Sequence, residues 1–274
     1  MVDKIEKILV VINEAEAIEK LLRKAAELQR TNNAVLEILF VHENRLFDIP
    51  DYFRTSETGG LDKKSIKAEI EKVLSSLETA SPYAVFIEES DTVDRVAAMI
   101  GKDTHTLILS AFREEITAKL AKKVSTAMLV LKSDIPEYRH ILFPVDMNEN
   151  NERYIQSVQT LFPSASIKLL FEPSYVTENY IFDEDFVALP LDPAVDIEFD
   201  QEMLETQKEA FEALKKRTGL SGEIVNELDA DIVAYINRQK ADLVVLHSEN
   251  ENFLFDDTLS KDLLTSIKTD LFIF

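Results

Sequence analysis

The first half of the chain alternates short apolar runs with stretches of helical periodicity. Apolar runs predict five β-strands, at 7–12, 36–41, 83–87, 107–109 and 128–131. Between them, apolar residues recur every three or four positions and predict four helices, at 18–28, 61–77, 91–101 and 113–125. Apolar strands that alternate with helices are typical of a parallel sheet that is covered by helices on both faces.

The second half repeats this order of strands. Four runs carry the repeat: 139–145 matches the first strand, 165–171 matches 34–40, 242–246 matches 106–110, and 271–274 matches 128–131. Matched strands in the same order indicate an internal duplication with its join near 133–137. We therefore expect two domains, 1–135 and 136–274. Each should be a doubly wound α/β sheet that places ligand sites at the carboxyl ends of its strands.

Three segments of the second half resemble universal stress proteins. The run Ile141-Leu142-Phe143-Pro144-Val145-Asp146 resembles the first strand of that family, which ends in an acidic residue, and 165–172 resembles the second strand. The run Ala241-Asp242-Leu243-Val244-Val245-Leu246-His247-Ser248 resembles the fourth strand. The likeness extends over both halves apart from 173–199.

The resemblance implies a fold and a pairing of the two halves. Each half would be a Rossmann-like domain, of the kind found in adenine nucleotide alpha hydrolases, with five parallel strands in the order 3-2-1-4-5. The fifth strands, 128–131 and 271–274, would pair with each other and make the chain an intramolecular pseudo-dimer. Such pairing would remove two short apolar edges from solvent, where they would favour aggregation.

Many members of that family bind ATP through a Gly-x2-Gly-x9-Gly-Ser/Thr motif after the fourth strand. Glycine lets the backbone approach phosphates, and a helix N-terminus attracts their charge. Neither half has the leading glycines: 110–117 reads Ser-Ala-Phe-Arg-Glu-Glu-Ile-Thr, and 247–253 reads His-Ser-Glu-Asn-Glu-Asn-Phe. The first segment is also shorter than the motif, and carboxylates within 249–257 would repel a triphosphate. We therefore predict that ATP binding is lost in both halves and that the protein has no cofactor.

The second half keeps part of a ligand site at the strand ends. Asp146 lies where the family has an adenosine-contacting aspartate, whereas Asn13 takes that place in the first half. Polar residues at the predicted strand ends would form a vestigial site for ATP or AMP, made of Asp146, Asn148, His247, Ser248 and Asn250. The alternative is that Asp146 only caps a helix or closes a loop.

Two kinds of catalytic chemistry fit the same strand ends poorly. Asp146, His247 and Ser248 are the residue types of a Ser-His-Asp hydrolase. Adjacent side chains diverge on a strand, however, and no Gly-x-Ser-x-Gly elbow occurs. The four histidines lack the i, i+4 spacing of a helical zinc site, and the chain has no cysteine. We therefore expect neither catalytic residues nor a metal site, and no enzyme activity.

Composition restricts the partners. The 274 residues carry a net charge of −21, which disfavours binding to nucleic acid and to anionic membranes. No apolar run reaches membrane-spanning length and no signal peptide opens the chain, so we expect a cytoplasmic protein.

The predicted function is a non-enzymatic stress-response protein that serves as a regulatory or binding platform for a protein partner. The alternative is a nucleotide- or ligand-binding stress protein that uses the site near Asp146. The sequence leaves open a homodimer.

An acidic segment interrupts the second half. Residues 172–207 contain eleven acidic residues and no lysine or arginine, with aromatic residues among them. We expect 173–199 to form an ordered flap in which Phe182, Phe186 and Leu189 fill the space that adenosine occupies in the family. The alternative is a mobile acidic loop.

Overall fold

We describe the fold from a computed structural model of the chain. The structure describes residues 5–43, 62–77, 83–101, 103, 105–135, 137–145, 147, 151–173, 201–225, 232–246 and 261–274. The domain boundary expected near residue 135 falls in the segment that connects the fifth and sixth strands.

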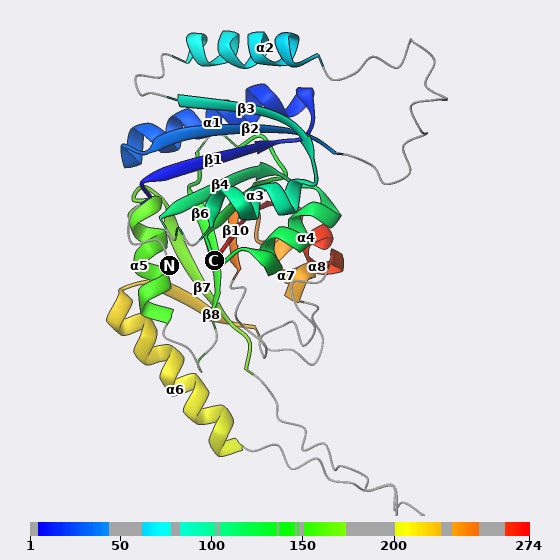
Figure 1. Cartoon of the computed structure of the whole chain (residues 1–274). Helices are drawn as coiled ribbons and strands as arrows, with labels where there is room; N and C mark the ends of the chain where they lie inside the picture. Colours follow the sequence, from blue (N-terminus) through cyan, green and yellow to red (C-terminus); the bar gives the residue numbers. More distant parts are fainter. Residues whose placement is uncertain are drawn as a thin grey trace, which may run out of the picture.

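The strands form a single 10-stranded sheet in the order β3-β2-β1-β4-β5-β10-β9-β6-β7-β8 (Figure 1). The first five are β1 (Lys7–Ile12), β2 (Val35–Glu43), β3 (Tyr83–Ser90), β4 (Thr106–Ala111) and β5 (Met128–Leu131). The others are β6 (His140–Val145), β7 (Ser166–Phe171), β8 (Ser221–Ile224), β9 (Leu243–Leu246) and β10 (Asp270–Ile273). Neighbours within β1–β5 run parallel in the predicted order 3-2-1-4-5, which confirms the predicted α/β fold class. Strands β6–β10 have the same relative order.

Helices cover both faces of the sheet, as expected of a doubly wound fold (Figure 1). One face packs against α1 (Ile18–Asn32), α2 (Lys63–Ser76), α5 (Asn151–Leu161) and α6 (Gln201–Thr218). The other face packs against α3 (Thr92–Ile100), α4 (Glu114–Lys123), α7 (Ile232–Arg238) and α8 (Lys261–Ser266). A 3-10 turn, η1 (Ala15–Ala17), leads from β1 into α1.

Local sequence signals set the ends of the helices. Asp91 caps α3 by accepting a hydrogen bond from the Asp94 N–H at 2.8 Å, and the helix ends at Gly101, whose φ is +59°. Helix α1 ends at Asn33, which adopts the left-handed conformation with φ +52°. These stops return the chain to the sheet, so that β2 and β4 begin at the same edge as β1.

The two groups of strands meet at β5 and β10, the only antiparallel pair among the described strands. Leu271 lies opposite Val130, Phe272 opposite Leu129, and Ile273 opposite Met128. The strand pairing expected from the resemblance is therefore confirmed. Phe272 is fully buried and makes edge-to-face contacts with Phe162 and Phe274, at centroid distances of 5.7 and 4.8 Å.

A buried carboxylate in β10 accepts hydrogen bonds from the segment that follows β5. Asp270 has no exposed surface, and its Oδ1 accepts hydrogen bonds from the backbone N–H groups of Lys132 and Ser133 at 2.7 and 2.8 Å. The Ser133 hydroxyl donates to the same oxygen at 2.8 Å, and the Tyr138 hydroxyl donates to Oδ2 at 2.8 Å. Burial and the Asp270 charge raise the pKa of Tyr138, which keeps its hydroxyl protonated as a donor.

Lys132 binds the same junction from its other side. Its ammonium donates to the carbonyl oxygens of Leu264 and Ile267 at the end of α8, and lies 4.0 Å from the centre of the Phe112 ring. A cation at a helix C-terminus is favourable because the terminal carbonyls carry partial negative charge. Burial nevertheless lowers the pKa of Lys132 to about 8, although the Asp270 charge acts in the opposite direction.

This depressed pKa predicts a pH dependence of stability. The ordinary pKa of a lysine is 10.5, so burying the ammonium costs stability below about pH 8. That cost is relieved as the pH rises from about 8 towards 10.5, because the native amine is then neutral while the unfolded one still binds a proton. We expect the free energy of unfolding of Lys132→Met to rise less than that of the parent protein across this window. Urea titrations at several pH values measure the difference, and equal slopes would contradict the assignment.

Candidate functional site

The topology places the candidate site at the carboxyl ends of β1 and β4. These adjacent strands lead to helices on opposite faces of the sheet, since β1 continues into α1 and β4 into α4. A crevice between diverging connections is the usual ligand site of such sheets. The connections that follow these two strands contain Asn13 after β1, and Phe112 and Arg113 after β4.

Asn13, which takes the place of the family's aspartate, is bonded within the protein. Its Nδ2 donates to the carbonyl oxygen of Val41 at 3.2 Å and to the Thr92 hydroxyl at 2.8 Å. Both amide hydrogens are therefore used in joining the ends of β1 and β2 to the start of α3. No N–H of this side chain is left to orient a ligand.

Glu43 completes the network. Its Oε1 accepts a hydrogen bond from the Thr92 N–H at 3.0 Å and a second one from the Thr92 hydroxyl. Thr92 has no exposed surface, so the contacts are shielded from water and favour one arrangement of the three side chains. The end of β2 thus carries a fixed negative charge at the N-terminus of α3, where anions are stabilised by the helix dipole.

The connection between β4 and α4 consists of Phe112 and Arg113 alone. The Arg113 N–H donates to the Thr117 hydroxyl at 3.1 Å, and its guanidinium lies 3.3 Å from a Glu14 carboxylate oxygen. The first turn of α4 contains Glu114 and Glu115. The connection between strand and helix is therefore only two residues long, and two carboxylates follow it directly.

The site residues predicted in the second half lie outside the described residues, and they are Asp146, Asn148, His247, Ser248 and Asn250. The strands that lead to them, β6 and β9, are described and are neighbours, with Ile141 paired to Leu243 and Leu142 to Val244. The vestigial nucleotide site therefore stays a prediction. The expected flap at 173–199 also lies outside the described residues, apart from Pro173.

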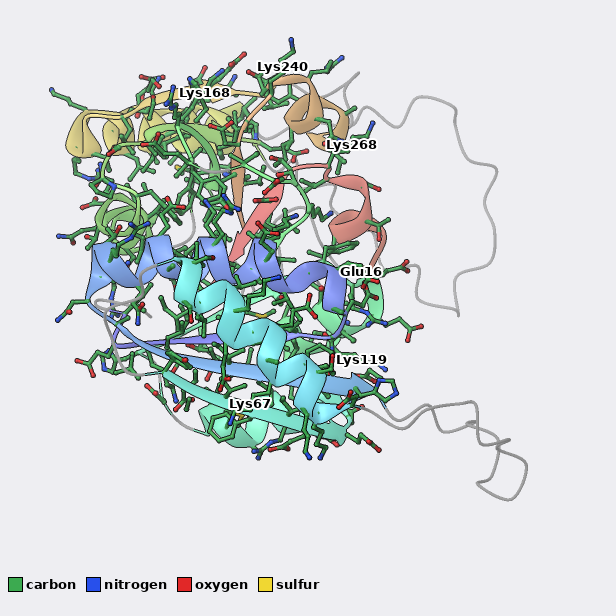
Figure 2. All side chains as sticks on the ribbon, turned by 90° about the horizontal axis from the view of Figure 1, so that it is seen from above. Glu16, Lys67, Lys119, Lys168, Lys240 and Lys268 are labelled. Carbon is green, nitrogen blue, oxygen red and sulfur yellow. The ribbon has the colours of Figure 1, made fainter. Side chains whose placement is uncertain are left out.

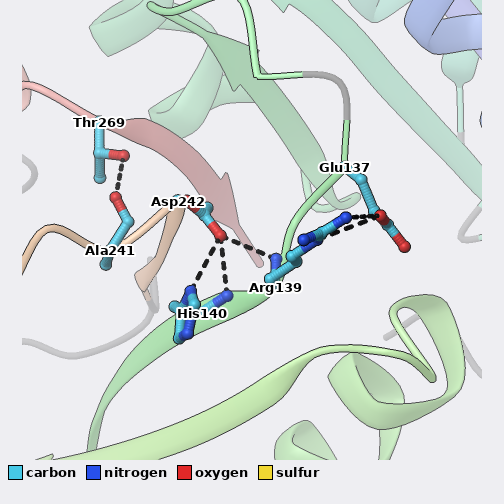
Figure 3. Close-up of polar contacts among 6 residues, drawn as sticks. All are labelled: Glu137, Arg139, His140, Ala241, Asp242 and Thr269. Carbon is cyan, nitrogen blue, oxygen red and sulfur yellow. Dashed lines mark hydrogen bonds and ion pairs between the residues drawn. The ribbon is translucent and has the colours of Figure 1, made fainter.

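A polar cluster that the sequence interpretation missed lies where β6 and β9 begin (Figure 3). The Asp242 Oδ2 accepts hydrogen bonds from the backbone N–H groups of Arg139 and His140, both at 2.8 Å, and lies 3.5 Å from the His140 Nδ1. Thr269 donates to the Ala241 carbonyl oxygen at 2.8 Å. These bonds fix the entry of β6, β9 and β10 into the sheet, at the edge opposite to the carboxyl ends of β6 and β9. The only signal in the sequence was an aspartate directly before an apolar run.

The described residues offer neither a metal site nor a membrane-spanning helix. No group of three or more histidine, aspartate or glutamate side chains in these residues could hold a metal ion. None of the helices in the described ranges is long and apolar enough to span a bilayer.

Comparisons with known proteins agree with the fold. Residues 4–133 match the model of the universal stress protein family. A solved protein of unknown function from Pseudomonas aeruginosa is 15% identical, with a TM-score of 0.59, over 98% of this chain and 92% of that one. A universal stress protein from Archaeoglobus fulgidus is 12% identical, with a TM-score of 0.59, over 97% and 95% of the two chains. At these identities the structural likeness shows the fold alone. No curated protein matches the sequence.

Proposed function

The first half of the chain carries a universal stress protein domain, and we propose that the whole chain is a tandem, non-enzymatic member of that family with a stress-response role. In this proposal it acts as a regulatory or binding platform for a protein partner, and family-type ATP binding is lost in both halves.

The short β4–α4 connection is the observation that carries the proposal. In the first half, Phe112 and Arg113 join strand and helix directly, and Glu114 and Glu115 follow. The side chain of the neighbouring Asn13 already donates hydrogen bonds to Val41 and Thr92. An adenosine phosphate would have to displace internal partners and approach two carboxylates without glycine amides to receive it. These features support a structural role for the first half.

The sequence of the second half also supports the proposed loss of family-type ATP binding. Its segment 247–257 has no glycine and contains four carboxylates. Asp146 takes the place of the family's adenosine-contacting aspartate, and it favours the second candidate, a nucleotide-binding protein that uses the second half. Both candidates are distinguished by the affinity for ATP and by its dependence on Asp146.

We predict a dissociation constant for Mg-ATP of about 1 mM or weaker, equivalent to about 4 kcal/mol of binding free energy. Isothermal titration calorimetry on the full chain measures it, and mass spectrometry of the denatured protein detects any co-purified nucleotide. Micromolar binding that disappears in Asp146→Ala but persists in Asn13→Ala would establish the second candidate instead. Micromolar binding that disappears in Asn13→Ala would overturn the proposal for the first half.

A further inference from the structure

A crevice lies between α1 and the segment that connects the two halves. Its volume is about 340 Å³. One wall comes from α1 residues between Lys20 and Arg30, and the other from Leu131, Ser133, Asp134, Ile135 and Glu137. Small-molecule sites commonly start at about 300 Å³ and occur at boundaries between structural units. We refer to this space as the junction crevice.

One wall of the junction crevice concentrates positive charge. Four basic side chains line it, all from α1: Lys20, Arg23, Lys24 and Arg30. Residues three, four and seven positions apart share one face of a helix, which explains why they gather on this side of α1. The chain as a whole has a net charge of −21, so such a grouping runs against its average composition.

Two of these cations already have carboxylate partners. Arg23 lies 2.6 Å from a Glu19 oxygen on the exposed surface of α1. The Lys24 side chain is only 5% exposed, and its ammonium lies 3.1 Å from Glu27 and 4.2 Å from the centre of the Tyr138 ring. Lys24 therefore forms a fixed, neutralised part of the wall.

The other two cations are available to a ligand. Within the described part of the chain, neither Lys20 nor Arg30 forms an ion pair. Arg30 donates its Nε–H to the Ala26 carbonyl oxygen at 3.3 Å. Its two Nη groups form no hydrogen bond with the described residues. A guanidinium edge of this kind binds a phosphate or carboxylate with two parallel hydrogen bonds.

We propose that the junction crevice binds a small multivalent anion, a phosphate- or carboxylate-bearing metabolite, through Lys20 and Arg30. The opposite wall limits its size and shape. Leu131 and Ile135 offer apolar contacts for a short carbon skeleton. Asp134 and Glu137 repel anions, so we expect the charged groups of the ligand to lie on the α1 side of the crevice, beside Lys20 and Arg30. A smaller hollow of about 170 Å³ shares Lys24, Glu27 and Glu137 with the crevice and extends it along α1.

Occupancy would stabilise the junction between the halves. Ser133 lines the junction crevice, and its backbone N–H and hydroxyl are both bonded to Asp270 of β10. A ligand held between α1 and this segment would bind the native arrangement and not the unfolded chain, so it should raise the unfolding temperature. The junction crevice is distinct from the carboxyl ends of β1 and β4, so its test does not depend on whether the protein binds ATP.

The test uses pyrophosphate and citrate as separate probes on the full chain at low ionic strength. We expect at least one of them to bind with a measurable heat and to raise the unfolding midpoint. In the double variant Lys20→Gln/Arg30→Gln, affinity should fall at least about tenfold, because each cation contributes a charge-assisted hydrogen bond. Binding of pyrophosphate alone would assign a phosphate ligand, and binding of citrate alone would assign a carboxylate.

The matched control is Lys67→Gln/Lys119→Gln, which removes the same charge from α2 and α4 (Figure 2). If this control retains binding while Lys20→Gln/Arg30→Gln loses it, the anion occupies the junction crevice. Absence of binding to both probes would overturn the proposal. An equal loss in the two double variants would also overturn it, since the attraction would then come from overall charge. Circular dichroism checks that both variants are folded.

Discussion

Replacing Asp270 with alanine is expected to lower the free energy of unfolding by about 3–5 kcal/mol, the usual effect of removing one partner from a buried charged network. The substitution leaves donors from Lys132, Ser133 and Tyr138 without their acceptor, a carboxylate that has no exposed surface. Each buried group that loses its partner costs about 1–3 kcal/mol, although losses within one network do not add. Since most native proteins are stable by only 5–15 kcal/mol, such a variant should be close to unfolding.

Urea denaturation of three variants tests the role of Asp270. Tyr138→Phe removes a single hydrogen bond to Oδ2 and should cost about 1 kcal/mol. Asp242→Ala is the matched control, because Asp242 also accepts two backbone N–H groups at 2.8 Å but its side chain is 23% exposed. Water can replace the lost acceptor there, so we expect a loss well below that of Asp270→Ala. Equal losses at the two aspartates would show that burial of Asp270 is not what makes it important.

The sheet could be predicted from the sequence because apolar runs mark its central strands. Strands β1, β4 and β5 are almost wholly buried and β2 is buried along its centre, and each was evident as an apolar run. The exception is β8, at one edge, whose sequence Ser-Gly-Glu-Ile alternates between exposed and half-buried positions. An edge strand is only partly covered, so it needs no apolar run and gives little signal.

The residues that fasten the junction could not be predicted from the sequence. Asp270 and Lys132 are separated by more than a hundred positions, and each is an ordinary charged residue in a chain that is 30% charged. Their burial follows from the antiparallel pairing of β5 with β10, which brings 132–133 against the start of β10. Only the three-dimensional arrangement identifies which of many carboxylates is desolvated.

The hydrogen-bond partners at the candidate site also could not be predicted from the sequence. The sequence indicated that Asn13 replaces an aspartate and that glycines are missing from 110–117. It did not reveal that Val41, Glu43 and Thr92 supply the partners of Asn13 and of one another. Those contacts depend on how three connections leave one edge of the sheet, which apolar periodicity does not specify.

Deleting residues 271–274 is expected to cause aggregation of the chain. The deletion removes most of β10, which pairs with β5 on one side and β9 on the other, so two central strands would gain unpaired apolar edges. It also removes Phe272, which is fully buried against Phe162. Burying a phenylalanine of this kind is worth about 3–5 kcal/mol by comparison with alanine. Size-exclusion chromatography with light scattering should show assemblies larger than one chain at micromolar concentration.

Point variants separate the two causes of that result. Phe272→Ala keeps the backbone pairing but creates a cavity, so we expect a lower unfolding midpoint without aggregation of the native protein. Phe274→Ala is the milder control, because that ring is partly exposed and follows the end of β10. If the deletion variant stayed monodisperse with the midpoint of the parent chain, β10 would not be needed to cover β5 and β9. The continuous sheet would then have to be held together chiefly by the bonds around Asp270, and Asp270→Ala would become the more damaging change.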